Sequence, residues 1–463
     1  MSALVSLFSG ILMPAALLLC GGYFAVRLGR FFFGSFRRVF GGIAEATGQG
    51  GTSPWRTLSV ALAGTLGVGN ITGVALAVAL GGAGAVFWMW VAAFAAMFLK
   101  YAETLLALST RETRNGNRHG GAMYYIRLAV KGSIGRSLAA AFAVLCVLTS
   151  LTLGGVIQTS AAAEALSGAL RIPPVAVGAV FALAAALVLI RGLRGVERVS
   201  AALIPFLCAA YTVLSLVAIV RGRAMLPAAF SAIFRGAFSL KSGLSGIGGF
   251  FVSGAFRYGI SRGLISNEAG CGTSPIAHAA SGVKEPAAEG LFGVLEVFVD
   301  TVLLCTLTAL VLLTSGVAPS TDGTYVLRAF GASCGAFAAP VLAVFMALFA
   351  FATVLCWAHY GQESLSYLTR RKKILTAHLI AVSLSAFLGA VAAPALLWDI
   401  TDLVLAFLTL LNLPALFLYR NVILEQTEQF FRKKSPCPGE SSPGQGEEPG
   451  RGACTDPVPH IRS

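Results

Sequence analysis

Long apolar stretches dominate the chain, and short segments between them hold most of the basic side chains. A helix that crosses a bilayer needs about 20 predominantly apolar residues, and many stretches reach this length. The pattern predicts an all-α integral membrane protein with about 11 transmembrane helices. We expect a separate leading helix in residues 1–28 and later spans near 56–80, 84–108, 137–168, 173–190, 199–220, 243–270, 288–315, 337–368, 374–393 and 397–424.

Two of these spans are unusually rich in glycine. The first contains the charge-free run from Gly64 to Gly73, and the second covers residues 243–270. Glycine inside a helix costs about 1 kcal/mol relative to alanine, so such spans are either packed very closely or unwound. Unwound backbone at membrane depth must be buried in protein or line a cavity. We favour broken helices, and close packing alone remains the alternative.

The basic residues give an orientation. Arginine and lysine concentrate in residues 29–55, 111–136 and 370–373, which the positive-inside rule places in the cytoplasm. The N-terminus is then outside and the C-terminus cytoplasmic. Residues 29–55 mix arginine with phenylalanine, which is typical of an interfacial segment. Residues 435–463, rich in Pro, Gly, Ser and Glu, are expected to form a disordered cytoplasmic tail.

The broken spans open two groups of five helices, at 56–221 and 243–424. Because five is odd, the second group must have the opposite orientation in the membrane. Paired glycine-interrupted spans in two inverted halves indicate the binding site of a secondary transporter.

Composition agrees with this interpretation and excludes others. The chain is 56% hydrophobic and 12% charged, whereas soluble domains carry about 25% charged residues. The net charge of +14 lies in short loops, which favours contact with anionic lipid rather than nucleic acid. The nine cysteines show no CxxC pair, and no nucleophile–base pair or P-loop is present. We therefore expect that the protein is not an enzyme and that it binds no cofactor apart from a coupling ion.

The first broken span supplies the candidate binding site. Freed N–H groups at Gly67, Gly69, Asn70, Thr72 and Gly73 would bind the carboxylate of an amino acid, because a helix N-terminus carries partial positive charge. Glycine also lets a ligand approach the backbone closely. The carbonyls of Leu66 and Gly67, with the hydroxyl of Thr353, would coordinate sodium.

Three side chains on other predicted helices are further candidates. Gln158 would meet the polar end of the substrate, although a hydrogen bond between neighbouring helices explains a buried amide equally well. Thr353 and Trp357 share a helix face because they are four residues apart. We expect Trp357 to wall the substrate pocket, and ordinary core packing is its alternative.

Charged residues suggest a gate. We expect Glu268 to pair with Arg262 in an inner gate that includes Asn267. Six further charged residues are assigned to span ends, where snorkelling or pairing explains them: Lys100, Glu103, Glu296, Asp300, Asp399 and Asp402.

From about residue 10 to 425, the sequence resembles the alanine/glycine:cation symporter family, also called sodium:alanine symporters. The resemblance rests on several motifs taken together: Gly67-Val68-Gly69-Asn70-Ile71-Thr72-Gly73-Val74-Ala75, Phe87-Trp88-Met89-Trp90, Lys100-Tyr101-Ala102-Glu103, Gly120-Gly121-Ala122-Met123-Tyr124-Tyr125-Ile126, Arg262-Gly263-Leu264-Ile265-Ser266-Asn267-Glu268-Ala269-Gly270, Pro275-Ile276-Ala277-His278-Ala279 and Trp398-Asp399.

The resemblance implies a leucine-transporter-type (APC) fold of two inverted five-helix repeats and sodium-driven uptake of small neutral amino acids, such as alanine or glycine, across the plasma membrane. The family's glutamine, threonine and tryptophan correspond to Gln158, Thr353 and Trp357. Ser160, Cys356 and Ala122 depart from the usual Asn, Gly and Pro. We expect a functional monomer. The alternative is a proton-coupled or exchanging transporter of the same fold, which acidic residues buried at mid-membrane would favour.

Overall fold

The computed structural model describes residues 2–33, 53–114, 116–239, 254–392 and 396–433. These residues are mainly helical, with one two-stranded antiparallel hairpin of β1 (Glu112–Arg114) and β2 (Asn117–His119). The helices of the first half are α1 (Ser2–Leu7), η1 (Phe8–Leu12), α2 (Met13–Phe33), α4 (Pro54–Thr65), η2 (Val68–Asn70), α5 (Thr72–Gly81), α6 (Gly84–Ser109), α7 (Ala122–Ala129), α8 (Gly132–Leu151), η3 (Thr152–Ile157), α9 (Gln158–Leu170), α10 (Pro174–Leu189), α11 (Leu193–Arg221), η4 (Arg223–Met225) and α12 (Leu226–Ala237).

The helices of the second half are α14 (Gly254–Asn267), α15 (Pro275–Ala279), α16 (Pro286–Val297), η5 (Phe298–Cys305), α17 (Thr306–Thr314), α18 (Tyr325–Cys334), α19 (Ala338–Leu368), α20 (Lys372–Val391), α21 (Leu396–Leu418) and α22 (Arg420–Lys433). Among the described residues, eight helical runs are long and apolar enough to cross a membrane, and the bent pair α4–α5 is a further one. The shorter α10 and α14 occupy other predicted spans. The all-α membrane fold is confirmed, while the total of about 11 spans stays a prediction.

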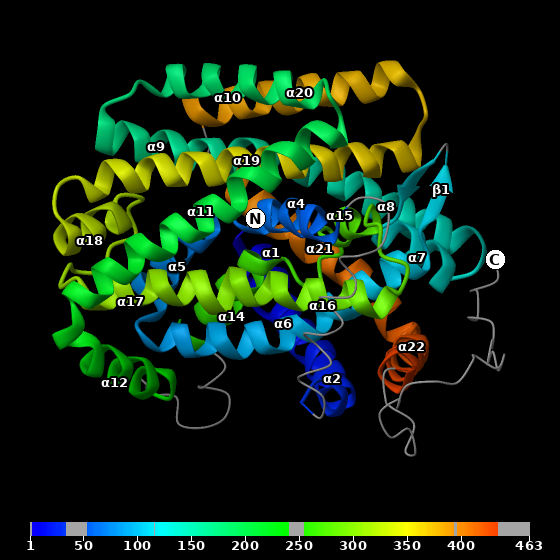
Figure 1. The fold of residues 1–463 in the computed structure, drawn as a ribbon, viewed down its shortest axis with the longest axis horizontal. Coiled ribbons are helices and arrows are strands. Elements are labelled where there is room, and N and C mark those ends of the chain that lie inside the picture. Colours follow the sequence, from blue (N-terminus) through cyan, green and yellow to red (C-terminus); the bar gives the residue numbers. More distant parts are fainter. Residues whose placement is uncertain (1, 34–52, 115, 240–253, 393–395, 434–463) are drawn as a thin grey trace, which may run out of the picture.

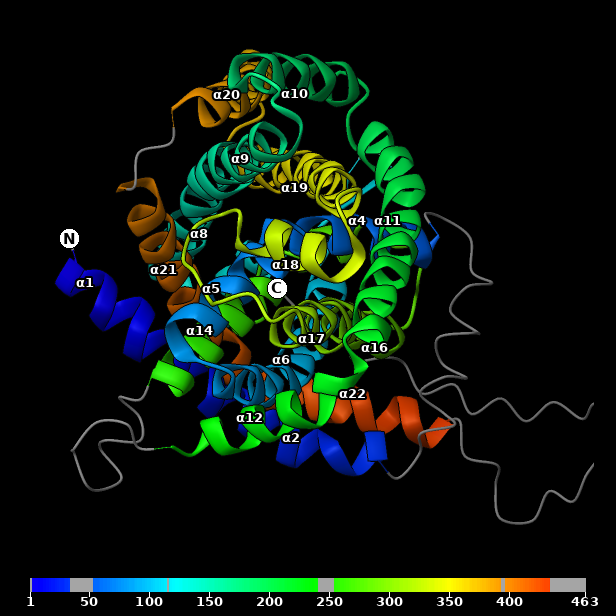
Figure 2. The same ribbon diagram turned by 90° about the vertical axis from the view of Figure 1, so that its left-hand side faces the viewer.

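The long helices run roughly side by side, from left to right in Figure 1. The hairpin and α7 lie at one end of this bundle, called here the hairpin end, and α12 and α18 lie at the other, called the α18 end. Viewed from the α18 end, α10 and α20 form an outlying pair beside α9 and α19, and α4 lies near the centre (Figure 2).

The first glycine-rich span is broken, as predicted. Helix α4 ends at Thr65, Gly67 is extended, and α5 begins at Thr72 after the 3-10 turn η2. The two helices meet at a bend of 64°. Close packing alone is therefore wrong for this span, although Gly64 does pack closely against Tyr360.

In its described part, the second span is helical from Gly254 and is interrupted at its end. Helix α14 ends at Asn267, and residues 268–274, called here the strap, are non-helical up to α15. Glu268, Gly270 and Gly272 all have positive φ, at 53°, 83° and 74°. The glycines between 240 and 253, where a break was also predicted, lie outside the described residues. So do most of the predicted interfacial segment 29–55 and the predicted tail 435–463.

Glycine allows α14 and α6 to lie against each other. A Cβ atom at Gly259 would lie 2.4 Å from the carbonyl oxygen of Ala85, and one at Gly263 would lie 3.3 Å from the Cα of Met89. Both helices advance in the same direction through this contact, as the predicted orientation of spans 84–108 and 243–270 requires. The division into inverted repeats at 56–221 and 243–424 stays a prediction.

Several short elements were not predicted. Besides the hairpin, they include the short helices α7, α12 and α18, and α22, which is separate from α21 although one span was expected over 397–424. At the hairpin end, His119 Nδ1 lies 2.7 Å from Glu363 Oε2 of α19. This hydrogen bond raises the pKa of His119 and fastens the hairpin to α19.

The contact between α6 and α14 gives a first prediction. Gly259→Ala should destabilise the protein by about 1–3 kcal/mol, because the added methyl group overlaps Ala85 and Trp88. Gly331→Ala in α18 is the control, since nothing lies within 4 Å of its Cβ position and alanine favours helix by about 1 kcal/mol. Thermal unfolding in detergent measures both, and equal melting temperatures would contradict this account of the contact.

Candidate functional site

A cavity lies at the break of the first span. It is lined by residues of α4, η2 and α5, by Gln158 beside the π-helical turn η3, and by the end of α14. The lining includes Gly67, Gly69 and Gly73, together with Thr72 and Gln158, so predicted residues from two parts of the chain meet there. Arg262, Ser266 and Glu268 complete the side formed by the second interrupted span.

Gly69 and Gly73 leave the backbone open toward this cavity. Nothing lies within 4 Å of a Cβ atom placed on either residue. Helix α5 begins at Thr72, and the N–H of Ala75 donates to the carbonyl of Ile71 at 3.2 Å. The N–H groups of Thr72 and Gly73 precede that first turn and so have no partner within their helix. They are suited to an anionic group, because the helix dipole adds partial positive charge.

Gln158 contacts the broken backbone directly. Its Oε1 accepts a hydrogen bond from the Val68 N–H at 3.1 Å, and a Cβ atom on Gly67 would lie 2.6 Å from the same oxygen. This is a hydrogen bond between neighbouring segments, which was one of the two interpretations of the buried amide. Gln158 also lines the cavity, which is where a ligand would meet it. Its role in ligand binding stays a prediction.

Thr353 lies next to the end of α4. Its hydroxyl donates to the Phe349 carbonyl at 3.0 Å and approaches the Leu66 carbonyl at 3.5 Å. A Cβ atom on Gly67 would lie 3.0 Å from the Thr353 Oγ1. The predicted sodium ligands Leu66, Gly67 and Thr353 are therefore neighbours, brought together from α19 and the first break.

Trp357 does not line the cavity. Its side chain is fully buried, packs edge-on against Tyr360 with ring centroids 5.5 Å apart, and contacts the backbone at Gly154. In this structure Trp357 packs in the core, as the alternative interpretation had it, and its role as a wall of the substrate pocket stays a prediction. The sequence could not separate the two, since both need a residue on the same helix face.

The expected pairing of Arg262 with Glu268 is not found either. No Arg262–Glu268 ion pair occurs within 4 Å in the described part of the chain, and the Glu268 carboxylate accepts a hydrogen bond from Thr273 at 2.9 Å. Asn267 anchors the end of α14 instead. It donates to Gly263 and Thr301, and accepts from the N–H of Ala269 at 3.0 Å.

Asp300 was assigned to a span end, and this was wrong. It lies near the middle of the run Pro286–Thr314, beside the first break, and is fully buried. Its Oδ1 accepts from Asn70 at 2.7 Å, and its Oδ2 accepts from Ser266 and Thr301 at 2.9 and 2.6 Å. Within the described residues no basic side chain pairs with it, and Asn70 Oδ1 has no hydrogen-bond partner.

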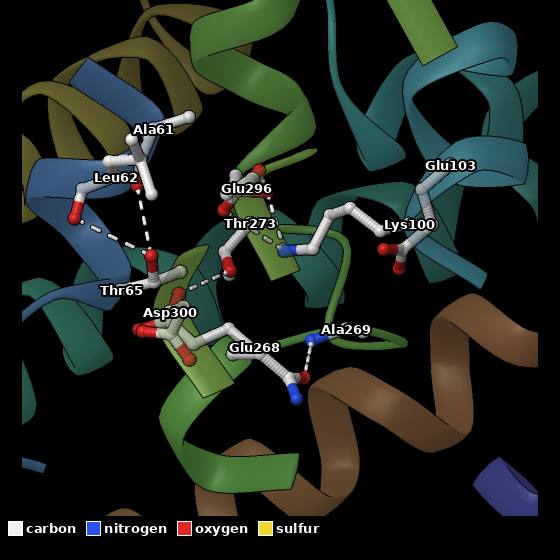
Figure 3. Close-up of polar contacts among 12 residues, drawn as sticks. Ala61, Leu62, Thr65, Lys100, Glu103, Glu268, Ala269, Thr273, Glu296 and Asp300 are labelled. Atoms are coloured by element: carbon white, nitrogen blue, oxygen red, sulfur yellow. Dashed lines mark hydrogen bonds and ion pairs between the residues drawn. The ribbon is translucent and has the colours of Figure 1, made fainter. Parts of the chain in front are cut away.

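Lys100, Glu103 and Glu296 are likewise fully buried instead of reaching the interface. Lys100 Nζ lies 2.6 Å from Ser274 Oγ and 3.4 Å from Glu296 Oε1 (Figure 3). Glu103 accepts from the Gly272 N–H at 2.9 Å. These side chains hold the strap from the α6 and α16 sides. Their signal in the sequence was the presence of charges inside otherwise apolar runs.

A helix broken inside a multi-pass bundle, with open glycine backbone lining a cavity, is typical of a membrane transporter. The model of the sodium:alanine symporter family matches residues 1–441, and the chain belongs to this family.

Curated relatives agree. The chain is 34% identical over 394 residues to "Sodium/alanine symporter AgcS" of Methanococcus maripaludis, covering 83% of this chain and 86% of that protein. It is 33% identical over 417 residues to "Amino-acid carrier protein AlsT" of Bacillus subtilis, covering 89% and 88%.

Solved structures show the same fold at low identity. The crystal structure of MhsT in complex with L-phenylalanine has a TM-score of 0.57 and 14% identity, covering 83% of this chain and 95% of that chain. An Eremococcus coleocola manganese transporter mutant has a TM-score of 0.53 and 16% identity, covering 81% and 75%. The leucine-transporter-type architecture is thus confirmed.

The contact between Gly67 and Gln158 generates a second prediction. Gly67→Ala should lower stability by about 1–3 kcal/mol, because the methyl group displaces Gln158 and leaves the Val68 N–H without its partner. Gly69→Ala, which meets open space, should unfold at nearly the wild-type temperature. A thermal unfolding series of both variants measures the difference, and a reversed order would refute the described geometry.

Proposed function

We propose that the protein is a secondary active transporter that imports small neutral amino acids, such as alanine or glycine, together with sodium by alternating access. The observation that carries this proposal is the open glycine backbone of Gly69 and Gly73 at the break of the first span. The names of the relatives AgcS, a sodium/alanine symporter, and AlsT, an amino-acid carrier protein, support the substrate class. We place the N-terminus outside and the C-terminus in the cytoplasm, so the hairpin end is the cytoplasmic one.

The substrate carboxylate would bind the N–H groups at the start of α5, where the helix dipole stabilises negative charge. Gln158 lies at the same break, so its amide would meet the polar end of the ligand. The space beside Gly69 and Gly73 exists only because these residues lack side chains. A small substrate fits this lining, since a larger side chain would compete for the same space.

Sodium would bind between the carbonyls of Leu66 and Gly67 and the hydroxyl of Thr353. Oxygen ligands of this kind suit a hard cation, and the carbonyls at the end of a half-helix carry partial negative charge. Substrate and sodium would then occupy opposite sides of the same short break. Each would stabilise the same arrangement of α4, η2 and α5, so each would raise the affinity of the other by the same factor.

The function is tested by uptake of labelled alanine into proteoliposomes. We expect accumulation driven by a sodium gradient, and loss of most of it in Gly73→Val, whose side chain would fill the cavity without meeting protein atoms near its Cβ. Gly22→Val in α2 is the matched control, because its Cβ position is also open but does not line the cavity. Equal losses in both variants, or equal uptake with choline replacing sodium, would reject the proposal.

Asp300 favours a second candidate, coupling to protons. A buried carboxylate without a basic partner among the described residues can carry a proton, and acidic residues at mid-membrane are typical of proton relays. One relative bears the name "Putative sodium/proton-dependent alanine carrier protein YrbD". The sequence-based preference for sodium assumed acidic residues near span ends, and Asp300 removes part of that argument.

Asp300→Asn separates the two coupling ions, because asparagine imitates the protonated carboxyl group. Under sodium coupling we expect sodium-driven uptake to persist with a several-fold higher half-saturating sodium concentration, since a negative charge near the break is lost. Uptake under a pH gradient without sodium, present in the wild type and absent from Asp300→Asn, would identify proton coupling instead. Exchange of external for internal alanine shows in both cases that the variant still binds substrate.

A further inference from the structure

A cluster of charged side chains is buried at the hairpin end and takes no part in the proposed binding site. It consists of His278 on α15, Glu289 and Glu296 on α16, and Lys100 on α6, called here the inner cluster. All four side chains are fully buried. His278 Nδ1 lies 2.7 Å from Glu289 Oε1, and His278 Nε2 lies 3.1 Å from Glu296 Oε2.

The position of this ring determines its protonation state. A neutral imidazole has one N–H and one lone pair, so it can donate to only one of two carboxylates. Here each ring nitrogen faces a carboxylate oxygen, and with both glutamates ionised the two contacts are both hydrogen bonds only when both nitrogens carry hydrogen. The carboxylate oxygens have other donors as well, since Ser281 donates to Glu289 at 2.7 Å and Ser274 to Glu296 at 3.3 Å.

Charge balance leads to the same conclusion. With both glutamates ionised, Lys100 and a doubly protonated His278 bring the inner cluster to zero net charge. A neutral His278 would leave one buried negative charge without compensation, which is costly in an apolar interior. Arg111, which follows α6, donates to the carbonyls of Ala279 and Ser281 at the end of α15. Within the described residues, no hydrogen bond or ion pair joins the ring to the other ionisable groups on the elements packed against α15: Arg56 on α4, Tyr101 and Glu103 on α6, Arg118 and His119 on β2, and His359, Tyr360 and Glu363 on α19.

The inner cluster joins several segments at the hairpin end. Thr57, in the first turn of α4, lies 3.5 Å from Glu289, and Lys100 binds Ser274 at the end of the strap. The strap leads back to Glu268, which lines the central cavity. Figure 3 shows Lys100 and Glu296 beside Thr273 of the strap, with Thr65 of α4 nearby. The cluster thus connects α4, α6, α15 and α16 at one end of the bundle.

We infer that His278 is a buried proton-binding site, and that its imidazolium ring clamps α15 to α16 beside the first turn of α4. The bound ligand is a single proton shared by hydrogen bonding with Glu289 and Glu296. The clamp keeps the hairpin end closed, and loss of the proton weakens it by leaving one carboxylate facing a lone pair. Only the link to the transport cycle rests on the proposed function. The protonation state itself does not.

The protonation state is tested by nitrogen NMR on full-length protein labelled at its five histidines. The His278 signals, identified by their loss in His278→Gln, should show an imidazolium ring at neutral pH. In Glu289→Gln one carboxylate is removed, so the ring should become neutral under the same conditions. A neutral ring in the wild type, or an unchanged imidazolium in Glu289→Gln, would overturn the inference. Glu289→Gln provides this answer even if His278→Gln does not fold.

The clamp is tested separately by hydrogen exchange of the backbone. In His278→Gln we expect residues 54–60 and 268–281 to exchange about tenfold faster than in the wild type at the same pH. His378→Gln is the matched control: His378 is also buried, but it contacts Ser150 and Gln362 outside the inner cluster. Unchanged exchange in His278→Gln, or an equal increase in the control, would refute the clamp. Neither experiment involves alanine or sodium, so failure here is distinct from failure of the proposed function.

Discussion

The structure depends on one constraint: backbone N–H and C=O groups must find partners where no water is available to supply them. Between Thr65 and Thr72 the first span gives up its regular helical bonding. The freed groups are not left facing lipid. The amide of Gln158 takes one N–H, the Thr308 hydroxyl donates to the carbonyl of Asn70 at 2.9 Å, and the cavity receives others. The break is stable because surrounding helices supply polar groups at that depth.

The second interruption is supported differently. Its backbone enters the left-handed region at Glu268, which is uncommon for a residue with a side chain. Partners from α6 and α21 hold the strap in this shape: Glu103 accepts from Gly272, and Asn412 donates to the carbonyl of Gly270 at 2.8 Å. Asn412 also donates to Glu103 at 2.5 Å, which links the supporting side chains into one network. Charges buried around the strap are therefore part of its construction.

The sequence could predict the first break because its cause is local. Closely spaced glycines in a charge-free run weaken a helix wherever they occur. The approach of Thr353 to Leu66 was instead expected from the resemblance to the family, since the two residues are 287 positions apart. The position of Asp300 could not be predicted in this way, because its partner Asn70 lies 230 residues away in the chain. A single acidic residue in an apolar run has the same local pattern whether it reaches the surface or meets a distant amide.

The same difference between local causes and contacts with distant residues explains why Trp357 and Arg262 do not lie as the sequence suggested. Helical spacing fixed the face on which Trp357 lies but not whether a cavity or the packed backbone of Gly154 would meet it. Proximity in sequence suggested that Arg262 would pair with Glu268. The left-handed turn at Glu268 changes the course of the chain at that residue, and its carboxylate binds Thr273 instead.

The bond between Gln158 and the Val68 N–H has a consequence for selectivity. If a ligand takes over this N–H, it must first displace a neutral amide that already satisfies it. An uncharged carbonyl would exchange one ordinary hydrogen bond for another and gain little. A carboxylate would gain, because hydrogen bonds to an ionised acceptor are roughly twice as strong as neutral ones. The Gln158 amide would therefore favour ligands with a free carboxylate, such as amino acids, over their amide or ester analogues.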